Sequence, residues 1–293
     1  MSTWLLLTIT GLGLGAMYFL IASGLSLIYG LMGVLNFAHG LFLTVGAFAL
    51  WFTESKLGGI PVLPRFLLAT VVALVVGAVF AALVEFAFIR PLYGRHIEQV
   101  LVTVGLALSG TALIIAIWGN DARLIAKPGW AGETTDVFGA HVPNDRWLEI
   151  LAAVLVLFGL EAFLRRTRYG LIIRAGVENR AMVTALGIDV RKAFTLVFAL
   201  GGVAAALAGV LSGLYFGDVD PNRGTSLVIF AFIVVVIGGL GSLRGTAVAA
   251  VVVGLVQQYA NYYASSGLGD LSVVLLLALV LLVRPSGFSR SFA

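Results

Sequence analysis

The stretch Arg165-Arg166-Thr167-Arg168-Tyr169-Gly170 opens a polar segment that ends at Lys192. Long apolar runs flank this segment on both sides, and it carries seven basic residues: Arg165, Arg166, Arg168, Arg174, Arg180, Arg191 and Lys192. A basic side chain at a bilayer centre costs roughly 2.5–3.5 kcal/mol, so burying all seven costs on the order of 20 kcal/mol. The segment therefore stays in water. Because basic loops between membrane spans face the cytoplasm, it predicts the orientation of the whole chain.

The remaining composition is that of a membrane protein. Hydrophobic residues make up 60% of the 293 residues and charged residues only 11%, which is far from the balance of a soluble domain. A helix that spans a bilayer needs about 20 mainly apolar residues. We therefore expect an all-α polytopic membrane protein with one membrane-spanning domain over residues 1–293. The sequence has nine apolar segments: 4–29, 31–52, 66–90, 100–118, 148–164, 194–216, 227–240, 246–262 and 271–283. Several of them are short or interrupted by glycine, so one or two helices could be broken or re-entrant, and eight crossings are an alternative to nine.

Alternation from the basic segment predicts an outside N-terminus and a cytoplasmic C-terminus. Twelve of the 18 basic residues then fall inside, against five of the 14 acidic residues. This bias agrees with the positive-inside rule. The net charge of +4 reflects the same loop asymmetry, and no basic face with interleaved aromatics points to nucleic acid. The loops expected outside are residues 53–65, 119–147, 217–226 and 263–270.

Groups able to carry out chemistry are scarce. Cysteine is absent, and Lys56, Lys127 and Lys192 lie outside any phosphate-binding loop motif. The three histidines are far apart in the sequence and suggest no metal site. We therefore expect no cofactor and no enzyme active site. The chain has the features of a conduit that takes its energy from other proteins.

Acidic residues near the ends of apolar segments have basic neighbours. Glu85 precedes Arg90 by five residues, and Glu161 precedes Arg165 by four. Both spacings allow ion pairs along a helix, so we interpret these carboxylates as structural partners.

Two glycine-containing stretches interrupt the apolar pattern in different halves of the chain. One runs from Tyr29 to Gly40 and the other from Ile237 to Gly245. Paired interrupted segments of this kind mark transport paths in membrane carriers. The glycines within the other spans are interpreted as close-packing positions.

The first of these stretches resembles a known family. Asn36-Phe37-Ala38-His39-Gly40, followed by Gly46-Ala47-Phe48, is similar to the first signature of LivH-type permeases, the membrane subunits of ABC importers for branched-chain amino acids. Further stretches complete the pattern: Gly170-Leu171-Ile172-Ile173-Arg174-Ala175 with Glu178-Asn179-Arg180-Ala181-Met182 and Leu186-Gly187-Ile188, Leu207-Ala208-Gly209-Val210-Leu211 with Gly213-Leu214-Tyr215, and Gly238-Gly239-Leu240-Gly241-Ser242 with Gly245. The similarity runs from about Gly11 to Gly254.

This resemblance implies a permease subunit in a bacterial inner membrane that moves branched-chain or other small hydrophobic amino acids inward. The implied partners are a second permease of the LivM type, two ABC ATPase subunits that hydrolyse ATP, an extracytoplasmic substrate-binding protein and membrane lipid. The family pattern also serves importers of urea and short-chain amides. Leu41 stands where the family often has an acidic residue. A stand-alone channel or secondary carrier for a small neutral solute is the alternative from another class, and the long basic segment weighs against it.

We place the translocation path beside the two interrupted stretches. Gly40 and Gly245 are expected to permit the breaks, while Asn36 and His39 either line the path or form hydrogen bonds between helices. The path residues are therefore Asn36, His39, Gly40, Gly238, Gly239, Gly241 and Gly245.

The resemblance also implies that the ATPase docks on the basic segment, at about residues 165–193. Residues 177–187 suit a helix of about three turns, with its apolar edge in a partner's groove or on lipid headgroups. Gly187 is expected to end this helix. The proposed coupling residues are Arg174, Val177, Glu178, Ala181, Met182, Ala185, Leu186 and Gly187.

Overall fold

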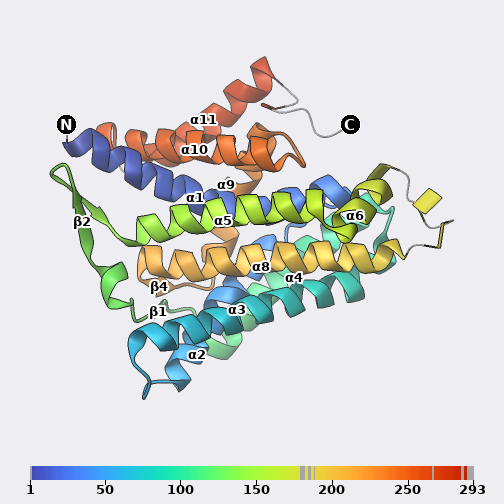
Figure 1. Ribbon diagram of the computed structural model, residues 1–293, viewed down its shortest axis with the longest axis horizontal. Helices are drawn as coiled ribbons and strands as arrows, with labels where there is room; N and C mark the ends of the chain where they lie inside the picture. Colours follow the sequence, from blue (N-terminus) through green and yellow to red (C-terminus); the bar gives the residue numbers. More distant parts are fainter. Residues whose placement is uncertain are drawn as a thin grey trace.

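The computed structural model describes residues 2–178, 182–183, 186–187, 189–265, 267–284 and 287–288. These residues form a mostly helical molecule (Figure 1). Its ten described α-helices are α1 (Ser2–Met32), α2 (His39–Lys56), α3 (Val62–Val84), α4 (His96–Trp118), α5 (Asp145–Arg166), α6 (Arg168–Glu178), α8 (Val190–Phe216), α9 (Arg223–Gly238), α10 (Leu243–Tyr263) and α11 (Leu268–Val283). Every predicted apolar segment contributes to a separate helix among these, which confirms the all-α polytopic architecture.

Fewer described helices than the eight or nine expected crossings have the length and composition of a complete span. By length and composition, five described helices can cross a membrane: α1, α3 with its extension to Leu92, α4, α5 and α8. Helices α9 and α10 form a pair bent by 119°, which counts as a sixth candidate at most. Helix α11 has only 16 residues, and α2 begins deep inside the protein at the fully buried His39. Apolar runs in the sequence thus include half-helices as well as complete spans.

Helices α1 and α8 form the centre of the molecule. The most apolar part of α1 is 72% buried and that of α8 is 67% buried, against 11% for α4 and for α5. Small residues allow this close packing because they bring helix backbones together. Gly15 of α1 lies against Ala250 of α10, and Gly202 of α8 lies against Gly77 of α3. This confirms the interpretation of these glycines as packing positions.

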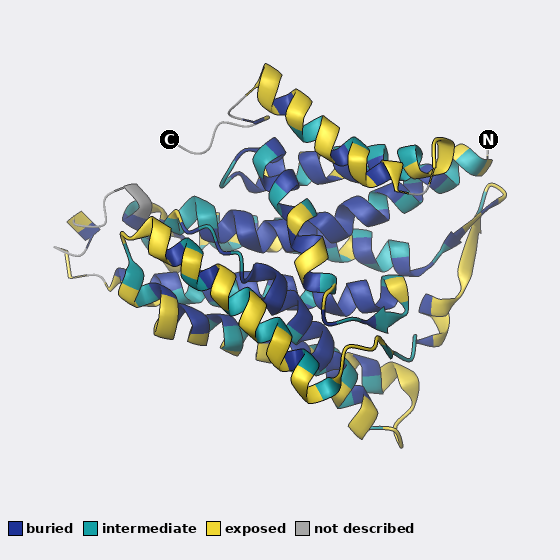
Figure 2. Cartoon of the chain, turned by 180° about the vertical axis from the view of Figure 1, so that it is seen from behind, coloured by how far each residue is buried: buried dark blue, intermediate teal, exposed yellow. Residues whose placement is uncertain are grey.

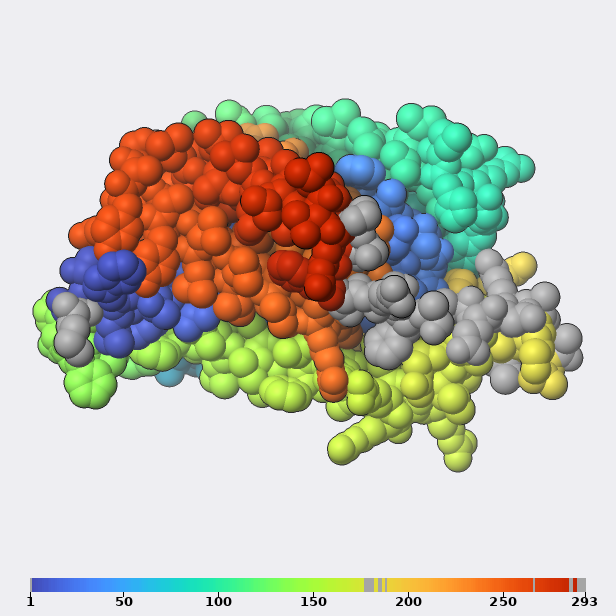
Figure 3. Space-filling view, turned by 90° about the horizontal axis from the view of Figure 1, so that it is seen from above, coloured from blue at the N-terminus to red at the C-terminus, as the bar shows by residue number. Residues whose placement is uncertain are grey.

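The outer helices expose apolar side chains along their length. Figure 2 shows such faces in yellow on α4 and α11. Leu108 of α4 and Leu282 of α11 are 67% and 87% exposed. Seen from above, α10 and α11 (orange and red) form one face of the molecule (Figure 3). Exposed apolar faces on long helices are what a lipid environment requires.

One end of the molecule, here named the hairpin end, gathers the loops expected outside. Strand β1 (Arg123–Leu124) pairs with β4 (Asp218–Val219), and β2 (Thr134–Val137) pairs with β3 (Ala140–Pro143), both antiparallel. A 3₁₀ turn, Gly129–Gly132, lies between the two pairs in the sequence. Trp4 contacts Tyr259 and Tyr263 at this end, which brings the start of α1 to the end of α10.

The opposite end, here named the basic end, carries the loops expected in the cytoplasm. Helix α3 continues into a π-helical turn, Glu85–Ile89, and a 3₁₀ turn, Arg90–Leu92, before α4 begins. Helix α6 lies at this end, far from the β2–β3 hairpin (Figure 1). Loops that were expected on the same side of the membrane therefore lie at the same end of the structure.

Candidate functional site

The first break in the helical pattern lies between α1 and α2. Gly33 ends α1 with a left-handed φ of 66°, a conformation that favours glycine. Residues 34–36 are irregular, 37–38 form a turn, and the chain resumes as a helix at His39. Asn36 organises this restart, because its Oδ1 accepts a hydrogen bond from Ala38 N at 3.1 Å and its carbonyl accepts one from His39 N at 3.2 Å.

The second break lies between α9 and α10. Gly239 and Gly241 have left-handed φ values of 95° and 83°, which suit glycine. Ser242 caps α10, since its hydroxyl accepts a hydrogen bond from Gly245 N at 3.1 Å. Gly238 packs against the backbone of Gly245 and Thr246, and this close approach allows the sharp bend.

These positions correct the expected roles of two glycines. Gly40 and Gly245 do not form the breaks, because each lies in the first turn of the helix that follows. The residues with the unusual backbone angles are Gly33, Gly239 and Gly241. Gly40 and Gly245 instead serve close approach between helices.

The two breaks lie close together in space. Gly30 and Gly241 are in backbone contact, so a Cβ on Gly30 would lie 2.5 Å from Gly241 Cα. Thr246 of α10 donates a hydrogen bond to Ser26 of α1 at 3.2 Å. This contact places Gly241 beside the end of α1, whereas Asn36, His39 and Gly40 lie beyond it.

Asn36 and His39 are fully buried, each at 0% exposure. The His39 Nε2 lies 3.0 Å from Ile21 O, so this ring links α2 to the middle of α1. Among the described residues, neither Asn36 Nδ2 nor His39 Nδ1 has a hydrogen-bond partner. A polar atom buried without a partner is costly and therefore points to an interaction outside the protein fold.

Gly40 brings α2 against α9. The backbones of Gly40 and Gly224 touch, and a Cβ on either residue would meet the carbonyl oxygen of the other. The packing role of Gly224 was not predicted, because this residue falls in the loop expected over residues 217–226. The signal was present as Asn222-Arg223-Gly224, a capping residue followed by a small residue in the first helical turn.

Leu41 occupies a packing position. It is 4% exposed, and its side chain fills the space beside Gly110 of α4. The residue that replaces the family's frequent carboxylate is therefore directed at a neighbouring helix, next to Phe48 and Ile114 in one apolar cluster.

Ion pairs at the basic end confirm two sequence predictions. Glu85 is fully buried and accepts hydrogen bonds from Arg90 at 3.0 Å and from Thr195 at 2.7 Å. Glu161 pairs with Arg165 at 2.9 Å and also with Arg244 at the start of α10. Both carboxylates thus connect helices that are distant in the sequence.

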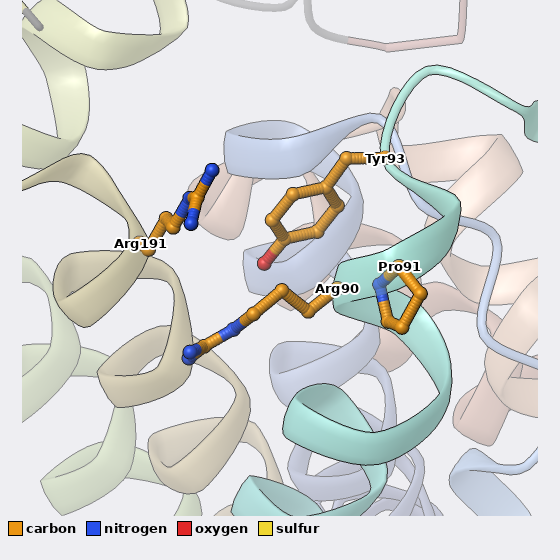
Figure 4. A pocket seen from close by; sticks show the side chains of 4 residues that line it. All are labelled: Arg90, Pro91, Tyr93 and Arg191. Carbon is orange, nitrogen blue, oxygen red and sulfur yellow. The ribbon is translucent and has the colours of Figure 1, made fainter.

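A pocket of about 520 Å³ opens at the basic end, lined by Arg90, Pro91, Tyr93 and Arg191 (Figure 4). Arg90 and Arg191 approach it from different helical segments. The pocket lies at the α3–α4 turn and the start of α8, apart from Asn36 and His39.

The predicted coupling residues are only partly described. Helix α6 ends at Glu178, and of the helix expected over 177–187 the structure describes only 177–178, 182–183 and 186–187, of which 182–183 are also helical. Arg174 is exposed on α6, and Met182 and Leu186 are 61% and 68% exposed. Gly187 has a left-handed φ of 78°, a conformation that favours glycine. Ala181, Ala185 and the side chains of Val177 and Glu178 lie outside the described residues.

A buried charge cluster near the hairpin end was not predicted. Asp145 pairs with Lys127 at 3.3 Å, and Arg146 pairs with Glu149 at 3.2 Å. The Arg146 guanidinium lies 3.4 Å from the ring centre of Tyr215. Through this contact the cluster joins α5 to α8. In the described part of the chain, no group of three or more acidic or histidine side chains could hold a metal ion.

The helices, their breaks and the exposed apolar faces define a polytopic membrane protein of the transporter class. The model of the family described as "Branched-chain amino acid transport system / permease component" matches residues 7–284. The chain belongs to this family. It is therefore the permease component of an ABC transport system, a multi-pass membrane protein homologous to bacterial inner-membrane transporters, and has no catalytic role of its own.

Three relatives illustrate the range of similarity. The branched-chain amino acid permease BraD of Pseudomonas aeruginosa is 31% identical, with 95% of this chain and 93% of BraD covered. LivH of Escherichia coli, a branched-chain amino acid permease, is 28% identical, with 94% and 92% covered. The fructose import permease FruF of Bifidobacterium longum is 30% identical, with 85% of this chain and 69% of FruF covered.

Proposed function

We propose that this permease carries branched-chain or other small hydrophobic amino acids inward, driven by ATP that partner subunits hydrolyse. The similarity to BraD and LivH over nearly the full length supports this substrate class. Similarity to a fructose permease leaves sugars as a competing substrate, and amides such as urea are another. The observation that carries the proposal is the first break, between α1 and α2, where the fully buried Asn36 and His39 each keep one side-chain nitrogen without a hydrogen-bond partner among the described residues.

The proposed path passes the first break and is bounded by the second. Asn36 and His39 supply polar atoms, while Gly40 permits the close approach of α9. The second break contributes a fixed bend of the backbone. Its path residues are Gly238, Gly239, Gly241 and Gly245.

The proposed assembly contains a second permease of the LivM type, two ABC ATPases and an extracytoplasmic binding protein. Members of the family act in ABC transporter complexes. The exposed α6 and the basic residues around it support ATPase docking at residues 165–193. The coupling residues proposed there are Arg174, Val177, Glu178, Ala181, Met182, Ala185, Leu186 and Gly187.

Uptake by the complete complex tests this function. The permease, its co-purifying subunits and the binding protein are reconstituted in proteoliposomes, and uptake of radiolabelled leucine, fructose and urea is compared. We expect ATP-dependent accumulation of leucine, with isoleucine and valine competing. Transport of fructose or urea without transport of leucine would refute the proposed substrate class.

Orientation is tested by cysteine labelling, because the chain has no cysteine. Phe138 is 93% exposed at the hairpin end and Leu171 is 62% exposed on α6. We expect Phe138→Cys to react with an impermeant thiol reagent on intact cells, and Leu171→Cys only after permeabilisation. The reverse pattern would invert every loop assignment. Ala131 would be a poor reporter on the outer loop, because it is only 3% exposed.

ATPase docking is tested by Ala181→Glu and Ala185→Glu. A charge in a docking groove should release the ATPase subunits or abolish stimulation of hydrolysis by the loaded binding protein. Phe138→Glu provides the control, because Phe138 is 93% exposed at the hairpin end, outside both the basic segment and the apolar helices. Normal stimulated hydrolysis in both alanine variants would exclude this segment as the coupling site.

A further inference from the structure

The pocket at the basic end lies where two membrane spans are joined by a short turn. The span that includes α3 ends at Leu92, and the next span begins with α4 at His96. Arg90, Pro91 and Tyr93, which line the pocket, belong to the end of the first span and to this turn. The ends of spans lie at the level of the lipid headgroups, because the apolar helices occupy the hydrocarbon core. The pocket therefore opens at headgroup level, on the side expected in the cytoplasm.

One wall of the pocket reaches the surface that faces lipid. The Arg90 guanidinium lies 4.8 Å from the ring centre of Phe86, a side chain of the same span that is 60% exposed. On the neighbouring span, Ile97 of the first turn of α4 is 76% exposed. Exposed apolar side chains on spans contact the acyl chains of lipids. A lipid whose headgroup enters the pocket would therefore lay its acyl chains along these side chains.

The pocket is lined by arginines from two helical segments (Figure 4). The buried Glu85 accepts hydrogen bonds from Arg90 Nε at 3.2 Å and from Arg90 Nη2 at 3.0 Å. This carboxylate fixes the side chain and leaves Arg90 Nη1 without a hydrogen bond among the described residues. The Arg191 guanidinium, on an exposed residue of α8, likewise has no ion pair in the described part of the chain. Both arginines thus retain donors for an anion.

The acidic side chains beside the pocket have other partners. Glu85 is bonded to Arg90, as described above. Asp189 caps α8 by accepting a hydrogen bond from Arg191 N at 3.1 Å, and its second oxygen lies 3.9 Å from Lys192 Nζ. Neither carboxylate forms an ion pair with the Arg191 guanidinium. The part of the pocket next to Arg191 therefore has a positive charge that the described residues do not neutralise.

We propose that this pocket binds the phosphate group of an anionic membrane lipid, with Arg191 and Arg90 Nη1 as donors. Basic pockets between membrane helices on the cytoplasmic side hold the headgroups of anionic lipids, and a guanidinium matches the oxygens of a phosphate. The volume of about 520 Å³ suits a ligand of headgroup size. A free phosphate ion shares this chemistry, but only a lipid also uses the exposed apolar side chains beside the pocket.

This site goes beyond the proposed transport function. Arg191 follows the proposed coupling residues, whereas Arg90 belongs to the span that includes α3. A lipid phosphate held by both arginines would join the start of α8 to the α3–α4 turn. The lipid is then a structural partner at the end of the segment proposed for ATPase docking.

Lipid preference next to the pocket tests the proposal. A fluorophore is attached to Ile97→Cys, in a chain without other cysteines, and for comparison to Leu282→Cys, which is 87% exposed on α11. The complete complex is placed in vesicles of equal parts phosphatidylglycerol and phosphatidylcholine, with bromine on the acyl chains of one lipid or the other. We expect brominated phosphatidylglycerol to quench more strongly than brominated phosphatidylcholine at Ile97→Cys, and both to quench alike at Leu282→Cys. Equal quenching by the two lipids at Ile97→Cys would overturn the proposal.

Arg191→Gln tests the donor. One basic residue near anionic lipid changes binding by about fivefold, so we expect the preference for phosphatidylglycerol at Ile97→Cys to fall about fivefold. Arg284→Gln is the matched control, because Arg284 is an exposed arginine at the end of α11 that does not line the pocket. It should keep the preference of the parent. An unchanged preference in Arg191→Gln would refute the assignment of Arg191.

Two additions separate the lipid from other anions. Inorganic phosphate that abolishes the preference would assign the pocket to a soluble ion. A preference seen only after the ATPase subunits are removed would assign the pocket to a carboxylate of a partner subunit. Either result would overturn the lipid site. The measurement needs no transported substrate, so a failure of leucine uptake would refute the proposed function and leave this proposal unchanged.

Discussion

The two breaks in this permease have similar sequences but different polar chemistry. Both use left-handed glycines, Gly33 at the first and Gly239 and Gly241 at the second. At the second break, Ser242 caps the next helix and Thr246 bonds to Ser26. At the first, Asn36 and His39 each retain a buried atom without a partner among the described residues. The second break fixes a bend, and the unpartnered atoms at the first break support the proposal that the substrate passes there.

The largest effect in this comparison is expected at the first break. In Gly40→Val the new side chain would overlap the carbonyl oxygen of Gly224, and such overpacking costs about 1–3 kcal/mol. We expect leucine uptake to fall at least about tenfold at equal membrane abundance. Gly105→Val is the control, since a Cβ on Gly105 meets nothing within 4 Å. Parent-like uptake by Gly40→Val would show that the α2–α9 contact is not part of the path.

A smaller effect, on stability, is expected at the second break. Alanine at Gly241 must adopt a left-handed φ, which costs roughly 1–2 kcal/mol, and its Cβ would also press on Gly30. Gly267→Ala measures the cost of the left-handed φ alone, because Gly267 has a φ of 98° and a Cβ there meets nothing within 4 Å. We expect thermal unfolding of the purified complex to occur at a lower temperature in Gly241→Ala than in Gly267→Ala. Equal unfolding temperatures would mean that the packed bend adds nothing to stability.

Much of the fold follows from local patterns. Each apolar segment forms a helix because, in lipid, a helix provides hydrogen bonds for the backbone N–H and C=O groups of about 20 apolar residues within the segment itself. The basic loops group at one end, and Glu85 and Glu161 pair with Arg90 and Arg165 as their spacing predicts. These features depend on residues close together in the chain.

The remaining features depend on tertiary contacts. His39, rather than Gly40, begins α2, because Asn36 bonds to both Ala38 N and His39 N. Nothing in the local sequence places Gly224 against Gly40. The number of complete crossings depends on tertiary contacts for the same reason, since an apolar run has the same sequence pattern in a half-helix and in a full crossing.

Solvent access at the two breaks tests the central claim most directly. Phe37→Cys and Leu240→Cys place a thiol at the first and second break, in a chain without other cysteines. Both variants are reconstituted with the complete complex, and reaction with a small water-soluble thiol reagent is measured with and without ATP and the loaded binding protein. We predict that turnover raises the labelling rate of Phe37→Cys several-fold and leaves that of Leu240→Cys unchanged. Turnover-dependent labelling at Leu240→Cys alone would contradict the account, because the substrate would then pass the second break.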